Sequence, residues 1–81
     1  MTFLDLKLNK IYKTLETCFV HSSIVLMDIT GREINVGEHF LLLSVIPEGK
    51  DFVHVEILTK DGIFYFFTKN KTDLRTFFKE V

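Results

Sequence analysis

The sequence has little of several features, and each shortage excludes a class of protein. It contains one cysteine, which rules out an internal disulfide and favours a reducing compartment such as the cytoplasm. No apolar run approaches the ~18 residues of a membrane-spanning helix, and charges interrupt the first residues, so neither a membrane anchor nor a signal peptide is predicted. Ten basic and eleven acidic residues are mixed along the chain, so the basic stripe of a dedicated nucleic-acid binder is missing.

Large apolar residues, by contrast, are abundant. Of the 81 residues, 47% are hydrophobic, and nine are phenylalanine. A chain of this length forms one domain, residues 1–81, and buries only roughly 60–65% of its unfolded surface. We therefore expect more large apolar side chains than the core can hide. A contiguous apolar patch on the surface marks a partner or a self-association face.

Three consecutive strands form the centre of the predicted fold. Residues 40–46 are apolar at nearly every position, which is typical of a strand covered on both faces. After a turn over residues 47–51, residues 52–59 alternate between apolar and polar side chains. Asp61-Gly62 is the strongest hairpin signal in the sequence, and residues 63–68 form the third strand.

Shorter elements are expected on both sides of this centre. Strands are expected over residues 8–14, 24–29 and 34–36. Residues 30–33 are typical of a turn, and residues 14–23 fit both a strand and a loop. Residues 72–75 favour a short 3₁₀ or helical turn with Thr72 as N-cap, and residues 74–81 fit a last strand or a short helix. Five or six short strands at this spacing predict an all-β barrel or sandwich.

The alternation also predicts which side chains face the core. The inward set is Phe40, Leu42, Val53, Val55, Ile57, Phe64 and Phe66, joined by Ile11, Met27, Ile34 and Val36. On the strand over residues 52–59, His54 and Glu56 then lie on the opposite face, and the histidines are expected at the surface.

Three segments carry a resemblance to a known family. Residues 34–42 are similar to the apolar–x–apolar–Gly–acidic entry into the second strand of Src-homology-3-like small β-barrels. Residues 51–57 resemble the third strand of that family, and residues 61–66 resemble its distal hairpin and fourth strand. The resemblance covers about residues 8–81 and implies a five- to six-stranded barrel. The layout is also similar to that of small bacteriophage domains of this fold.

The chain departs from the peptide-binding members of that family at two places. Tyr12-Lys13-Thr14 replaces the aromatic–acidic–aromatic signature that follows their first strand, and Tyr65 stands where their fourth strand has proline. Recognition of proline-rich peptides is therefore not implied. The resemblance does place Phe52 and Tyr65 at ligand-facing positions with Tyr12 near them, and such aromatics are typical anchors for a protein surface. Packing under the first hairpin or the last strand is the alternative for these side chains.

The leading hypothesis is a non-enzymatic protein-interaction module, a phage-encoded regulator or inhibitor of a host protein. Its predicted binding residues are Phe52, Tyr65, Tyr12, Glu33 and Glu38. Together with Asp28, the two glutamates flank the first long hairpin and would steer a basic partner. A solvated hairpin explains the same charges without a partner.

Two other functions stay open. Barrels of the KOW type contact RNA, ribosomes or polymerase, and this resemblance implies a nucleic-acid or transcription-machinery regulator. Its phosphate contacts would be Lys10, Lys13, Lys69, Lys71 and Arg75. A structural or self-assembling subunit, which buries its surplus apolar face in a homo-oligomer, is the third hypothesis.

Catalytic and metal sites are not predicted. Cys18, His21 and Asp28 supply a thiol, a base and an acid close together in sequence, but no family signature surrounds them, and Cys18 fits a small buried hydrophobe. The histidines show no metal-ligand spacing, and a turn centred on Gly49 would pair Ser44 with His54 and leave His39 remote from it. We therefore expect no enzyme, no metal and no cofactor.

Overall fold

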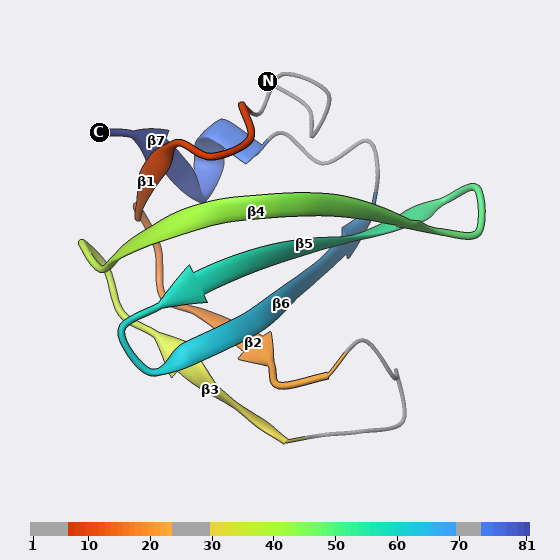
Figure 1. The fold of residues 1–81 in the computed structure, drawn as a ribbon, viewed down its shortest axis with the longest axis horizontal. Helices are drawn as coiled ribbons and strands as arrows, with labels where there is room; N and C mark the ends of the chain where they lie inside the picture. Colours follow the sequence, from red (N-terminus) through yellow and green to blue (C-terminus); the bar gives the residue numbers. More distant parts are fainter. Residues whose placement is uncertain (1–6, 24–29, 70–73) are drawn as a thin grey trace.

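The computed structural model describes residues 7–23, 30–69 and 74–81, and these form one antiparallel sheet curled into a half-barrel (Figure 1). Its strands are β1 (Ile11–Thr14), β2 (Cys18–His21), β3 (Gly31–Ile34), β4 (His39–Glu48), β5 (Phe52–Thr59), β6 (Gly62–Lys69) and β7 (Phe78–Glu80). A 3₁₀ turn, η2 (Leu74–Thr76), precedes β7. The strand order is β3-β2-β6-β5-β4-β1-β7. The predicted all-β class is confirmed.

The described residues form seven strands rather than the predicted five or six. β2 is an added strand, in the segment over residues 14–23 that fitted both a strand and a loop. β3 begins where a turn was expected over residues 30–33 and ends at Ile34, where the strand over residues 34–36 was expected to begin. These two strands pair from Cys18↔Ile34 to His21↔Gly31. The strand predicted over residues 24–29, which includes Met27 and Asp28, lies outside the described residues.

The β2–β3 hairpin requires glycine at position 31, because there is no room for a side chain there. Its φ is +156°, and a Cβ placed on it would lie 2.1 Å from the carbonyl oxygen of Val20. Cross-strand backbones therefore approach at this point more closely than any side chain allows.

The three central strands follow the predicted hairpins, with a change of register in β4. β4 extends through Pro47 to Glu48, and Glu48 pairs with Phe52, so the turn is shorter than expected and centred on Lys50. A bulge between Leu42 and Ser44 shifts the pairing. Because the bulge adds one residue, even-numbered side chains face the core before it and odd-numbered ones after it. The bulge thereby places Ser44, the one polar residue within residues 40–46, on the face opposite the core.

The core confirms most of the inward set. Ile34, Phe40, Leu42, Val53, Val55, Ile57 and Phe66 are buried, and Phe64 packs against the core while partly exposed. The expectation is wrong for Ile11, which is 50% exposed, and for Val36, which is 62% exposed. Ile11 is out of phase because Tyr12 pairs with Phe40 and takes the inward position, and Val36 lies in the turn after β3.

The C-terminal segment completes the core as a strand rather than a helix. β7 pairs with β1 through Thr14↔Phe78 and Tyr12↔Glu80. The Phe78 ring lies 5.1 Å from the ring centres of both Phe40 and Phe66, edge-on to each. The predicted 3₁₀ turn is present as η2, whose Leu74 is fully buried. Thr72 lies outside the described residues. Within the described residues, no helix is long and apolar enough to cross a membrane.

Candidate protein-interaction site

The sheet has a core face and an opposite face, here called the outer face. Directly paired residues of antiparallel strands share a face, and successive residues alternate between faces. Val53, Val55 and Ile57 of β5 point to the core side, so the residues between them point outward. The outer positions of β5 and β6 pair as Phe52↔Lys69, His54↔Phe67, Glu56↔Tyr65 and Leu58↔Ile63.

Phe52 lies on the outer face, 37% exposed, and stacks on Phe67. Their ring centres are 5.1 Å apart, and the ring planes are 15° from parallel. Tyr65 is two residues from Phe67 on β6 and half-buried. We call Phe52, Phe67 and Tyr65 the aromatic surface. Because the stacking fixes the Phe52 ring before any partner arrives, binding through it costs little side-chain entropy.

Hydrogen bonds fix the third member of this surface. The Tyr65 hydroxyl donates to Glu56 Oε2 at 2.9 Å, and the Ser44 hydroxyl donates to Glu56 Oε1 at 2.9 Å. The hydrogen bond to Glu56, helped by desolvation, raises the pKa of Tyr65 above its ordinary value. Tyr65 is therefore a neutral phenol at physiological pH, with its ring held against the strand.

His54 is not a surface residue, contrary to the sequence-based expectation. It points to the outer face but is fully buried, with its ring centre 4.9 Å from that of Phe67. His54 Nε2 lies 3.5 Å from Glu48 Oε2, and neither ring nitrogen has a hydrogen-bond partner in the described part of the chain. The register that hides it also differs from the expected one, since Ile46, and not Ser44, pairs with His54.

Tyr12 does not belong to the aromatic surface, because it packs in the core, which was the alternative stated for these side chains. It is 1% exposed and lies on the core side, with its ring stacked 6.1 Å from that of Phe40. Its hydroxyl accepts a hydrogen bond of 2.9 Å from the backbone N–H of Lys7. A partner cannot reach this side chain without opening the core.

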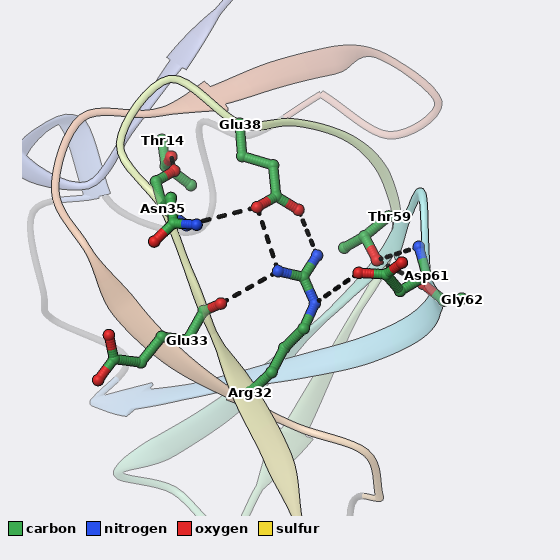
Figure 2. Close-up of polar contacts among 8 residues, drawn as sticks. All are labelled: Thr14, Arg32, Glu33, Asn35, Glu38, Thr59, Asp61 and Gly62. Atoms are coloured by element: carbon green, nitrogen blue, oxygen red, sulfur yellow. Dashed lines mark hydrogen bonds and ion pairs between the residues drawn. The ribbon is translucent and has the colours of Figure 1, made fainter.

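The two predicted acidic residues have different environments, and Figure 2 shows both. The Arg32 guanidinium donates to both carboxylate oxygens of Glu38, and its Nη1 donates to the backbone carbonyl of Glu33 at 3.0 Å. Arg32 Nε also lies 3.3 Å from Asp61 Oδ2. We call Arg32, Glu38 and Asp61 the clasp, because they connect β3, the turn before β4 and the β5–β6 turn.

Within the clasp, the positive charge of Arg32 balances the negative charge of the ionised Glu38 carboxylate. The hydrogen bond from Arg32 is the largest cause that lowers the Glu38 pKa, and the same bond raises the Arg32 pKa. The Arg32 guanidinium also lies over the Phe64 ring, 5.4 Å from its centre. Glu38 is therefore bound inside the fold. In contrast, the Glu33 carboxylate points away from Arg32 to the exposed side (Figure 2).

The basic residues of the nucleic-acid hypothesis are not gathered in one place. Lys13 pairs with His39 at the start of β4, whereas Lys69 pairs with Phe52 opposite the end of β4. At ~3.3 Å per residue, the two ends of β4, beside which Lys13 and Lys69 lie, are roughly 30 Å apart along the strand. Lys10 precedes β1, Arg75 lies in η2, and Lys71 lies outside the described residues.

Cys18 and His21 do not form a reactive pair. They are three residues apart on β2, so their side chains point to opposite faces of the strand. Desolvation, followed by the charges of Glu16 and Glu38, raises the pKa of Cys18 to about 11. The thiol is therefore protonated at neutral pH and is a poor nucleophile.

Sequence reasoning missed Phe67, Ser44 and Arg32 as neighbours of the predicted site residues. The position of Phe67 depends on the exact turn: the two turn residues are Lys60 and Asp61, Thr59 pairs with Gly62, and Phe67 therefore lies opposite His54. A two-residue turn at Asp61-Gly62, as its sequence signal indicates, would have placed Lys69 there instead. No local pattern identified Arg32, whose partners come from other turns.

Comparisons of this chain with models of known protein families, with curated proteins and with solved structures find no match.

Proposed function

We propose that this protein is a non-enzymatic protein-interaction module of the cytoplasm, and that its partner contacts the aromatic surface. In biological terms, we propose a phage-encoded regulator or inhibitor of a host protein. The observation that carries the proposal is Phe52, a large apolar side chain that is both exposed and held in place by stacking on Phe67.

The fold part of the proposal is a Src-homology-3-like barrel. The resemblance of residues 34–42, 51–57 and 61–66 supports it. The curled sheet and the 3₁₀ turn before the last strand are compatible with it.

The chemistry of the aromatic surface supports a protein partner. Aromatic side chains are enriched among the residues that dominate binding energy, and truncating such an anchor to alanine typically costs ~2 kcal/mol or more. The surface also has polar groups beside its rings, since the Tyr65 hydroxyl and Glu56 lie next to Phe67 on the same face. Glu33, an exposed carboxylate on β3, remains available to attract a basic partner.

Affinity capture from host lysate, with and without nuclease, tests the proposal. We expect one nuclease-resistant protein that is lost with Phe52→Ala and is retained with Val36→Ala, an exposed apolar residue in the turn before β4. Both variants should melt close to wild type. Retention of the partner by both Phe52→Ala and Tyr65→Ala would remove the site. Recovery that collapses with nuclease would favour a nucleic-acid regulator, and recovery of the bait alone would favour self-assembly.

A further inference from the structure

A second apolar feature crosses the outer face away from Phe52. Ile11 of β1 pairs with Leu41 of β4, Leu41 with Leu58 of β5, and Leu58 with Ile63 of β6. We call these four residues the apolar row. Their side chains share the outer face, because the next residues along the strands (Tyr12, Phe40, Ile57 and Phe64) are in the core or pack against it.

The apolar row is open to solvent. Ile11 is 50% exposed, Leu58 is 41% exposed and Ile63 is 48% exposed, while Leu41 between them is half-buried. Three strand spacings of ~4.8 Å make the row roughly 15 Å long. Val81, whose N–H donates to the Ile11 carbonyl at 2.9 Å, lies at one end and is also exposed. Such a contiguous apolar strip across four strands is typical of a contact surface.

A row of basic residues borders one side of this strip. Lys13 pairs with His39 on β4 and with Lys79 on β7, so the three side chains share the outer face two residues beyond Ile11. We call Lys13, His39 and Lys79 the basic row. Like charges directly opposite one another destabilise a sheet. In the part of the chain that the structure describes, no carboxylate forms an ion pair with Lys13 or Lys79.

The opposite side of the apolar row carries a negative charge instead of positive ones. Ser44, Glu56 and Tyr65 form the next row of the outer face, and they are joined by hydrogen bonds to the Glu56 carboxylate. The apolar row therefore lies between two lysines and a carboxylate. This asymmetry disfavours a uniformly anionic surface, such as a phospholipid bilayer, and gives a docked segment a defined orientation.

We propose that the apolar row and the basic row form one docking surface for an acidic segment of a protein partner. The segment inserts apolar side chains along Ile11, Leu41, Leu58 and Ile63 and places its carboxylates against Lys13 and Lys79. Charge complementarity carries this assignment, because carboxylates relieve the Lys13–Lys79 repulsion when they bind. The Ser44–Glu56–Tyr65 row separates this docking surface from the Phe52–Phe67 stack, so the inference stands independently of the proposed function.

Titration of the isotope-labelled full chain, followed by nuclear magnetic resonance, tests the inference. The probe is a short synthetic amphipathic peptide of leucine and glutamate. Control peptides replace glutamate by lysine or leucine by serine. We expect the acidic amphipathic peptide alone to shift the backbone signals of the apolar and basic rows. Its affinity should fall as salt is added, because the lysines are exposed or half-exposed.

Charge-reversed variants make the test specific. The double variant Lys13→Glu with Lys79→Glu should bind the acidic peptide at least about tenfold more weakly and gain affinity for the lysine peptide. Leu58→Ser in the wild-type background should weaken binding of the acidic peptide, and in the double variant it should weaken binding of the lysine peptide. Lys69→Glu, at the other end of the outer face, is the matched control and should change the affinity for neither peptide. All variants should melt near wild type, since the replaced side chains lie outside the core.

Several outcomes would overturn the inference. Equal binding of the acidic and basic peptides, or signal shifts confined to the Phe52 end, would remove the docking surface. Tighter binding of phosphatidylserine vesicles or of RNA to the same residues would assign it to another class of partner. A dimer in light scattering that Leu58→Ser dissociates would assign it to a second copy of this chain. Because Phe52→Ala leaves both rows intact, failure of the proposed function is measured separately.

Discussion

Replacing Glu38 by glutamine tests the clasp, because this variant keeps the shape of the side chain and removes its charge. The side chains of Arg32 and Glu38 are only 22% and 12% exposed, and Arg32 contacts both carboxylate oxygens. Hydrogen bonds to charged groups contribute about 1.5–3 kcal/mol, and fully exposed ion pairs contribute about 0–1 kcal/mol. Arg32 keeps Asp61 as a partner in the variant. We therefore expect Glu38→Gln to lower the free energy of unfolding by about 1.5 kcal/mol.

Thermal unfolding followed by circular dichroism measures this loss. For a domain of this size, 1 kcal/mol corresponds to about 4–8 °C, so the melting temperature should fall by about 6–12 °C at pH 7. Glu33→Gln is the matched control. Glu33 is on the same hairpin, and its exposed carboxylate makes no contact with Arg32 while its backbone carbonyl does. We expect its melting temperature to change by no more than about 2–4 °C.

The pH dependence gives an independent test of the same contact. Arg32 lowers the pKa of Glu38 in the folded protein. The stabilisation is therefore complete above the unfolded-state pKa of about 4.3, and it is lost as the pH falls through the lower folded-state value. The difference between wild type and Glu38→Gln should shrink as the pH falls below about 4. A Glu38→Gln protein that melts with wild type at pH 7, or a difference that does not change with pH, would refute this account of the clasp.

Three further predictions concern the core and the thiol. Gly31→Ala should destabilise the β2–β3 hairpin strongly, because its Cβ would lie 2.1 Å from the Val20 carbonyl oxygen; a denaturant midpoint equal to that of wild type would contradict this close approach. Phe66→Ala should lower the free energy of unfolding by about 3–5 kcal/mol, because Phe66 is 7% exposed and contacts Phe78; near-native melting would exclude it from the core. Cys18 should react slowly with iodoacetamide at pH 7 and faster as the pH approaches its pKa of about 11; rapid labelling of the native protein at neutral pH would show that the thiol is activated.

The sequence predicts the central part of the fold well, because its signals are local. The Asp61-Gly62 signal locates the β5–β6 hairpin to within one residue, since the two turn residues are Lys60 and Asp61, and most predicted core residues of these strands are buried. The β2–β3 hairpin was harder to predict. Its pairing depends on a close backbone approach at Gly31, and Gly31 was predicted to lie in a turn.

The errors at the candidate site have a common cause, which is that the facing of a side chain depends on its partners in other strands. Tyr12 and Ile11 are neighbours of similar apolarity, and only the pairing of Tyr12 with Phe40 decides which of them is buried. His54 alternates like a surface residue, but Phe67 from β6 packs against it. The resemblance placed Phe52 at a ligand-facing position, while its stacking partner could be identified only from the register of β5 and β6.

The bulge in β4 has a consequence for how this chain tolerates changes in length. Leu42 and Ser44 already pair with successive residues of β5, Ile57 and Glu56, so deleting Leu43 would give a regular ladder in which Ser44 still faces outward and Val45 still faces the core. Deleting a residue between Ser44 and Glu48 would instead exchange the faces of the residues beyond it. Homologous chains should therefore lose a residue between Leu42 and Ser44 more readily than elsewhere in β4.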